Sequence, residues 1–171
     1  MKKGLRNFIK KILHYIELEG IPFLGSVIYN KIMKNFSLYN SILQKIASSE
    51  LIKNIKGPIL DIGTGPSYLT IYIARNNANC NIAGLDISPD MTKIAYSNVE
   101  KFNLMDRISL KIANAENIPF PDNFFNFVIS TGSFHHWKNP IKVFNEIYRV
   151  LKPNCTAWIF DVINPYQKNN F

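Results

Sequence analysis

From residue 57 onward, short apolar runs alternate with longer segments of helical periodicity. The apolar runs that predict strands are 58–62, 81–87, 108–113, 124–131 and 156–163. The segments with helical periodicity are 66–77, 89–103 and 140–151. Because strands that are apolar on both faces and alternate with helices indicate a parallel sheet covered on both sides, the pattern predicts an α/β fold.

The first third of the chain has a different texture, with helical periodicity alone. Residues 5–18 predict an amphipathic helix, because apolar positions at helical spacing share one face while lysines and an arginine lie largely elsewhere. Further helical pattern covers 27–53, with an interruption predicted near "NFSLYN". We therefore divide the chain into an N-terminal helical cap, residues 1–56, and a core, residues 57–171.

The formal net charge of +8 changes this picture little. The one local basic cluster is "MKKGLRNFIKK", and no nucleic-acid-binding motif accompanies it, so no nucleic-acid partner is predicted. The basic amphipathic helix leaves three roles open: a lid over a ligand site, a solvated face packed on the core, or binding to an anionic membrane. Two cysteines without pairing spacing, and no membrane-spanning apolar run, predict a cytoplasmic protein.

The stretch "GPILDIGTGPSYL" carries the first chemical signal, because ligands of such sheets bind beyond the carboxyl ends of the strands. A dinucleotide site needs G-x-G-x-x-G, and its third glycine position holds Tyr68. Asp61 would also repel a pyrophosphate, whereas it suits a positively charged ligand such as S-adenosylmethionine. Asp86, 21 residues after Gly65, can supply one carboxylate oxygen to each hydroxyl of a ribose diol.

Five segments together resemble one family, the class I S-adenosylmethionine-dependent methyltransferases acting on small molecules, which include quinone-biosynthesis enzymes. The segments are "LDIGTGPSYLT", "GLDISPDM", "NAENIPFPDNFFNFVIS", "GSFHHWKNP" and "EIYRVLKP". The resemblance covers residues 57–163 and implies a Rossmann-like sheet of order 3-2-1-4-5-7-6. We expect the order 3-2-1-4-5 here, with the final strand pair missing, because only "NPYQKNNF" follows the fifth strand.

The resemblance also implies roles for individual residues. Asp61, Gly63 and Gly65 would hold the methionine end of S-adenosylmethionine, Asp86 and Ile87 the ribose side, and Asn114 and Ala115 the adenine. Ser130 begins a segment that would face the methyl group and a small-molecule acceptor. His136 and then His135 are the candidate general bases, with a role in shaping the pocket wall as the alternative. No metal site is predicted.

Several positions depart from the family pattern. Ser67 replaces the usual third glycine, which is acceptable if the backbone there does not need a positive φ. Asn114 and Asn126 replace common acids, and Asn154-Cys155 replaces Gly-Gly before the fifth strand. These departures motivate an alternative function, a degenerate methyltransferase-fold binding or regulatory protein without turnover.

The predicted fifth strand would form an exposed apolar edge, which sheet proteins normally avoid. The chain could be a fragment, the N-terminal helices could cover the edge, or two copies could pair there. We expect pairing of two copies, and therefore a homodimer.

Overall fold

A single five-stranded sheet organises the computed structural model, which describes Val27, Lys31 and residues 37–161. The strands are β1 (Ile59–Ile62), β2 (Ile82–Asp86), β3 (Ile108–Ile112), β4 (Phe125–Thr131) and β5 (Leu151–Phe160). They lie in the order β3-β2-β1-β4-β5, and every neighbouring pair is parallel. The predicted α/β fold and its strand order are confirmed.

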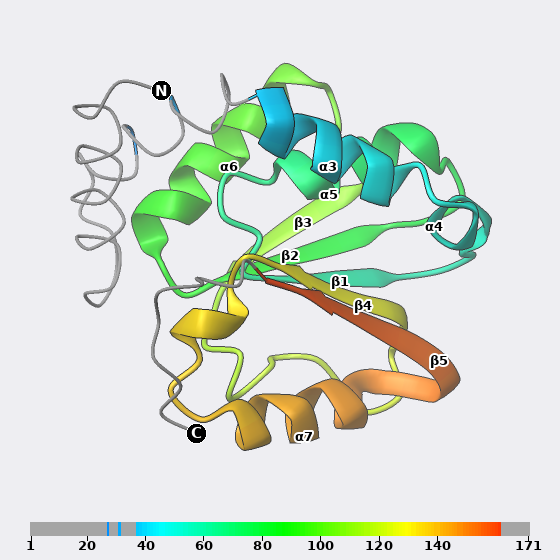
Figure 1. Ribbon diagram of the computed structural model, residues 1–171, viewed down its shortest axis with the longest axis vertical. Coiled ribbons are helices and arrows are strands. Elements are labelled where there is room, and N and C mark those ends of the chain that lie inside the picture. The colour runs from blue at the N-terminus through cyan, green and yellow to red at the C-terminus, as the bar shows by residue number, and fades with distance from the viewer. Residues whose placement is uncertain (1–26, 28–30, 32–36, 162–171) are drawn as a thin grey trace.

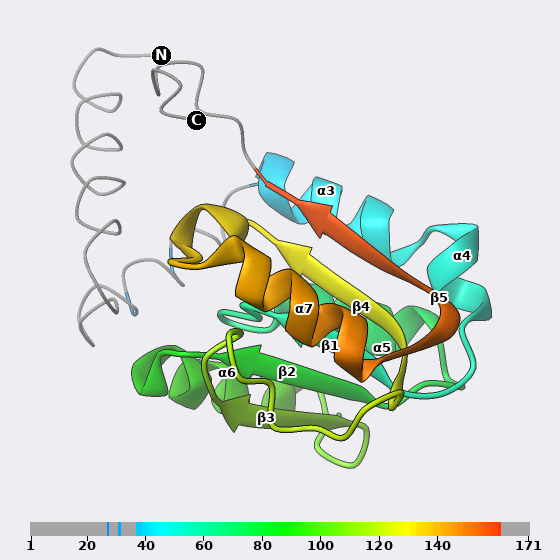
Figure 2. The same ribbon diagram turned by 90° about the horizontal axis from the view of Figure 1, so that it is seen from below.

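Helices cover the two faces of this sheet unequally (Figure 1). On one face lie α3 (Ser37–Ala47), α4 (Glu50–Asn54), α5 (Tyr68–Asn76) and α6 (Pro89–Lys101). The other face carries α7 (Pro140–Val150), and Figure 2 shows α7 beside β4 and β5. No helix links β3 to β4 in the described chain; a loop makes that connection.

Local sequence signals explain where two of the helices begin. Helix α6 starts with Pro89 after Ser88, whose hydroxyl accepts a hydrogen bond from the Met91 N–H at 3.2 Å. Helix α7 starts with Pro140 after Asn139, whose side-chain oxygen accepts from the Lys142 N–H at 3.1 Å. Proline fits the first helical turn because its missing N–H would have no helical partner there, and Ser and Asn are strong caps.

The alternation of side chains along the strands divides the core into two clusters. Ile59 packs on the α3–α6 face with residues that include Leu43, Ile52 and Ile71. Its neighbour Leu60 packs on the α7 face. Helices α3 and α4 thus share a core with α5, although the 1–56 boundary assigns them to the cap. That boundary stays a prediction.

Two expected element bounds can be compared with the structure. Strand β5 begins at Leu151, directly after α7, so the predicted start at 156 is wrong; a register shift between Phe125 and Phe127 accommodates the earlier start. Asn154, which replaces the first glycine of the family's Gly-Gly, has φ 63°, and asparagine tolerates this left-handed region better than most other non-glycine residues. Helix α3 begins at Ser37, within the interruption predicted near 35–40, and residues 35 and 36 lie outside the described residues.

Other expectations lie outside the described residues. These are the amphipathic helix at 5–18, the lid it would form, and residues 162 and 163 of the predicted fifth strand. The final strand pair concerns the chain beyond residue 161 and stays a prediction.

Candidate active site

The glycine loop follows β1 and turns the chain into α5. The N–H groups of Gly63 and Thr64 both donate to the Leu85 carbonyl, at 2.8 and 2.9 Å, which ties the loop to β2. Gly63 has φ 71°, and a Cβ there would lie 2.4 Å from the Ser133 Cβ. Gly65 has φ 53°, yet a Cβ there would meet no atom within 4 Å. Gly63 is therefore required by packing, whereas Gly65 leaves the backbone open to a ligand.

Ser67 caps the start of α5 in the left-handed region, with φ 65° and ψ 24°. Serine was expected to replace the family's glycine without strain only if φ were not positive, so this replacement does strain the backbone. The conformation costs a non-glycine residue about 1–2 kcal/mol. Its buried hydroxyl lies 3.1 Å from the Thr64 Oγ1, and this hydrogen bond offsets part of the strain.

Asp61, at the end of β1, is buried and only half satisfied. Its Oδ2 accepts hydrogen bonds from the Thr70 and Thr64 hydroxyls, at 2.6 and 2.9 Å. Its Oδ1 is buried and has no hydrogen-bond partner among the described residues. Burial raises the pKa of the Asp61 carboxyl to about 6; the two threonine hydrogen bonds oppose that rise, and the charge of Asp86 adds to it.

Asp86 joins the glycine loop to the end of β2. Its Oδ2 accepts from the Gly65 N–H and its Oδ1 from the Ser88 N–H, both at 2.9 Å. Burial raises the pKa of this carboxyl, while those backbone donors act in the opposite direction. Each oxygen keeps a lone pair for a further donor, so a diol still fits. The next side chain, Ile87, is 63% exposed.

The segment predicted to read adenine follows β3. Asn114 is exposed, and its Oδ1 accepts from the Glu116 N–H at 2.9 Å, while Ala115 is half-buried.

Two residues of α7, which lie in the quoted segment "EIYRVLKP" but received no predicted role, hold the loop after Ala115 in place. Glu146 accepts from the Ile118 N–H at 2.7 Å, and Arg149 donates to the Ile118 carbonyl at 2.8 Å.

The end of β4 brings the remaining predicted residues together. Ser130 is buried, and its hydroxyl lies 2.6 Å from that of Ser133. His135 and His136 lie on a short 3-10 turn, η1 (Phe134–His136), with ring centroids 4.0 Å apart. Asp161, directly after β5, contacts His135 with Nδ1 and Oδ1 2.9 Å apart. Sequence reasoning missed Asp161 because it placed this residue inside a strand.

A small cavity of about 40 Å³ lies beside the glycine loop. Tyr39 and Leu43 of α3 line it together with Gly65, Thr131 and Gly132. The structure therefore joins the β1 loop, the β4 end and a helix of the N-terminal third around one space.

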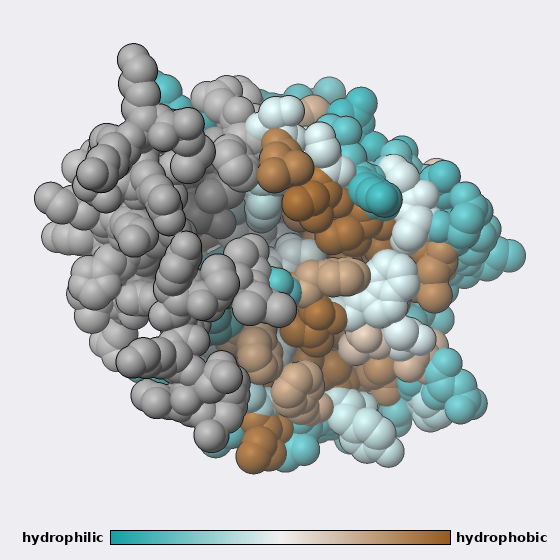
Figure 3. All heavy atoms as spheres, in the orientation of Figure 1, coloured by the Kyte–Doolittle hydropathy of each residue, from teal (hydrophilic) through white to brown (hydrophobic). Residues whose placement is uncertain are grey.

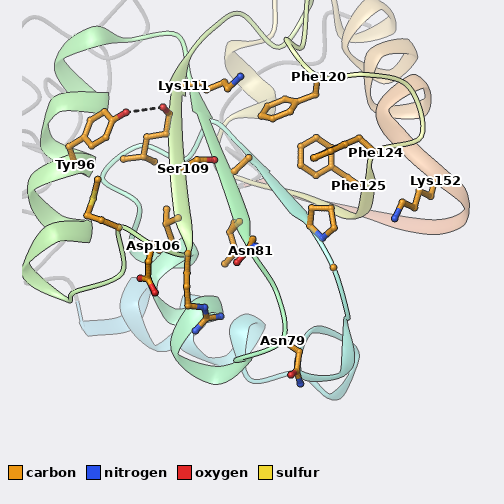
Figure 4. A pocket seen from close by; sticks show the side chains of 18 of the residues that line it. Asn79, Asn81, Tyr96, Asp106, Ser109, Lys111, Phe120, Phe124, Phe125 and Lys152 are labelled. Carbon is orange, nitrogen blue, oxygen red and sulfur yellow. Dashed lines mark hydrogen bonds between the residues drawn. The ribbon is translucent and has the colours of Figure 1, made fainter.

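A much larger hollow, about 810 Å³, lies at the opposite end of β2 and β3 (Figure 4). Its lining includes Tyr96, Lys111, Phe120 and Phe124, which lie around β3 and the loop before β4. None of the predicted site residues lines it.

The donors and acceptors at the glycine loop fit S-adenosylmethionine. A buried carboxylate oxygen without a partner is costly and suits a ligand ammonium. The open space at Gly65 and the two oxygens of Asp86 suit the rest of such a ligand. Over the described ranges, no three His, Cys, Asp or Glu side chains gather in a way that could hold a metal ion.

Comparisons with known proteins agree with this geometry. Residues 60–159 match the methyltransferase domain family. The chain belongs to the class I S-adenosylmethionine-dependent methyltransferases. The methyl donor of this family is S-adenosylmethionine.

Two curated relatives and one solved structure illustrate the match. Demethylmenaquinone methyltransferase of Lactiplantibacillus plantarum is 29% identical over 82% of this chain and 63% of its own length. Sterol 4-C-methyltransferase strm-1 of Caenorhabditis elegans is 32% identical over 78% of this chain and 39% of its own length. A Methanococcus maripaludis structure assigned to the S-adenosylmethionine-dependent methyltransferases has a TM-score of 0.73 at 31% identity, covering 83% of this chain and 64% of that one.

This chain spans less than two thirds of the length of these relatives. Among the helices that the structure describes, none has the length and apolar character needed to cross a membrane.

Proposed function

We propose that this methyltransferase transfers the methyl group of S-adenosylmethionine to an O, N or C atom of a small-molecule acceptor. The observation that carries the proposal is the buried Oδ1 of Asp61, which has no partner in the described chain and lies at the end of β1 before a glycine open to a ligand. An ammonium donor there would pair the carboxylate, stabilise its charged form and leave no polar atom orphaned.

The chain's own groups then have separate roles. Asp61 holds the ammonium, and Asp86 accepts from the ribose hydroxyls while its hydrogen bond to the Gly65 N–H keeps the loop in place. Asn114 and Ala115 face the adenine edge, and Ile87 offers an exposed apolar surface beside it. When bound, S-adenosylmethionine supplies an electrophilic methyl group. The protein contributes alignment of the acceptor with that methyl, which supplies much of the rate.

The test combines binding and turnover. Calorimetric titration with S-adenosylmethionine should give a one-site isotherm, and Asp86→Ala should weaken it by the roughly 1.5–3 kcal/mol of a charge-assisted contact. Mass spectrometry should then detect S-adenosylhomocysteine after incubation with acceptors, beginning with demethylated quinols and sterols, the classes that the relatives' names indicate. Absence of binding overturns the proposal, whereas binding without turnover on any acceptor favours the binding or regulatory alternative.

We also propose that a second copy covers the β5 edge. Strand β5 pairs only with β4 in the described chain. Large exposed apolar side chains lie on it and on α7, namely Phe160, Ile141, Phe144 and Tyr148. Figure 3 shows apolar side chains gathered between α3 and α7. Light scattering should give a dimer, and Tyr148→Lys, at an 85% exposed position, should dissociate it without unfolding the chain.

A cytoplasmic location, without a nucleic-acid or membrane partner, completes the proposal. Cys80 and Cys155 support this location, because both are free thiols in the structure, as expected of a chain in a reducing compartment.

A further inference from the structure

The ends of β4 and β5 join in a contact that the glycine-loop chemistry does not use. Asp161 lies 26 residues after His135 in the chain, yet its carboxylate meets both the backbone and the ring of that histidine. The His135 N–H donates to the Asp161 Oδ2 at 2.8 Å. The ring Nδ1 lies 2.9 and 3.0 Å from the two carboxylate oxygens.

This arrangement fixes which ring nitrogen carries the proton in neutral His135. An ionised carboxylate only accepts hydrogen bonds, so Nδ1 must donate, and Nε2 is left with its lone pair free. Among the described residues, the hydrogen bonds of the His135 ring are both made by Nδ1, and 42% of the side chain is exposed. Within the described ranges, the titratable groups that contact His135 are Asp161, from the end of β5, and His136, whose ring lies beside it on the same turn.

We propose that Asp161 is a positioning residue that holds His135 as the Nδ1–H tautomer, so that Nε2 is the base for methyl transfer. The inference rests on the proposed function and selects His135 over His136. As the acceptor atom bonds the methyl carbon, the C–S bond breaks and its electron pair stays on sulfur. The acceptor's proton moves to Nε2, and Asp161 stabilises the imidazolium that results.

The first experiment measures the tautomer directly. Nitrogen-15 NMR of the histidine side chains, with His135→Gln to assign the signals, should find Nδ1 protonated in neutral His135 of the parent chain. In Asp161→Asn the new amide can donate to Nδ1, so the signal should move toward the Nε2–H tautomer. A parent His135 in the Nε2–H form overturns the proposal, whatever the turnover.

The second experiment measures turnover in a double-mutant cycle. Asp161→Asn should lower kcat about 10²-fold, the scale of a lost general base, while the Kd for S-adenosylmethionine stays within two-fold. Asp161→Glu should restore part of the rate. In the His135→Gln background, Asp161→Asn should have no further effect, because groups that act as a unit are not additive. Asp106→Asn removes an exposed carboxylate beyond the other end of β3 and is the matched control.

The two backgrounds separate a catalytic arrangement from a structural one. Asp161 also accepts the His135 backbone N–H, and a purely structural role through that bond would persist when the ring is gone. An equal fall in kcat in both backgrounds therefore overturns the proposal. A parent chain that binds S-adenosylmethionine but methylates no acceptor would instead overturn the proposed function, and the tautomer would still decide whether Asp161 positions His135.

Discussion

The two ends of β2 and β3 differ in cavity size, and the end with the larger cavity is not the end that carries the candidate site. The larger hollow, about 810 Å³, lies at the amino ends of the strands, and the space at the glycine loop is only about 40 Å³. The side chains that line the large hollow are of kinds common on protein surfaces, such as the exposed Tyr96 and Phe124. Its Arg107 is satisfied by the carbonyls of Ala74 and Cys80, among others.

The cavity at the glycine-loop end is small, but the residues around it lower the stability of the fold. It holds a buried carboxylate oxygen without a partner in the described chain, and Ser67 in the left-handed region. Asp61 and Asp86 both have raised pKa values there, chiefly because burial disfavours their charges. Strain and unsatisfied polarity persist where a ligand repays them. The comparison teaches that polar cost, rather than volume, marks the site in this chain.

The largest expected effect comes from removing the charge of Asp61. Asp61→Asn should weaken S-adenosylmethionine binding about 10²–10³-fold, because a buried ammonium would lose its counter-charge.

Asp61→Asn should also stabilise the ligand-free chain above pH 6. The carboxyl has a pKa near 3.8 when unfolded and about 6 when folded, so the folded state binds more protons between these values. Its stability therefore falls as pH rises through that window, by up to about 3 kcal/mol.

Thermal or urea unfolding of both proteins between pH 4 and 8 checks the stability effect. The parent chain should lose stability across the window from about pH 4 to 6, whereas Asp61→Asn should show a flatter profile. Asp106→Asn, an exposed acid, is the control. A parent profile that rises through this window would contradict the assignment of an uncompensated buried carboxyl.

The two glycines of the loop separate packing from ligand space. Gly63→Ala should destabilise the fold by about 2–3 kcal/mol, because its Cβ overlaps the Ser133 side chain in a well-packed region. Gly65→Ala should cost only about 1 kcal/mol of backbone strain, since its Cβ meets nothing. Gly65→Ala should nevertheless lose S-adenosylmethionine affinity, measured by calorimetry. Equal destabilisation by both changes would erase the distinction.

The sequence predicted the parts of this site that local pattern controls. Apolar runs and their spacing predicted a parallel α/β sheet, and the family resemblance supplied its strand order. Asp61, Gly65 and Asp86 meet because they end or follow neighbouring parallel strands. The strain at Ser67 could not be predicted, because residue type alone does not determine φ. Asp161 was missed because its contact with His135 depends on where β5 ends, and element ends are poorly determined by pattern.

The large hollow should tolerate change without affecting the site. Tyr96 donates to the Leu110 carbonyl at 3.0 Å at its wall. Tyr96→Phe should cost the roughly 0.5–1.5 kcal/mol of one hydrogen bond, seen in urea unfolding. The Kd for S-adenosylmethionine should stay within two-fold of the parent value. A ten-fold loss of affinity would place the ligand at this end of the sheet and reverse the comparison.

The smallest effect concerns Asn114, at the rim of the glycine-loop end. Its Oδ1 already accepts from the Glu116 N–H, so a single lone pair of that atom remains for the adenine amino group. Asn114→Asp keeps the turn with one oxygen and offers the other, charged, to adenine. Because the residue is exposed, S-adenosylmethionine binding should tighten only a few-fold. Asn114→Leu, which loses both bonds, should bind more weakly than the parent in the same titration. If Asn114→Leu binds as well as the parent, adenine is read by other residues.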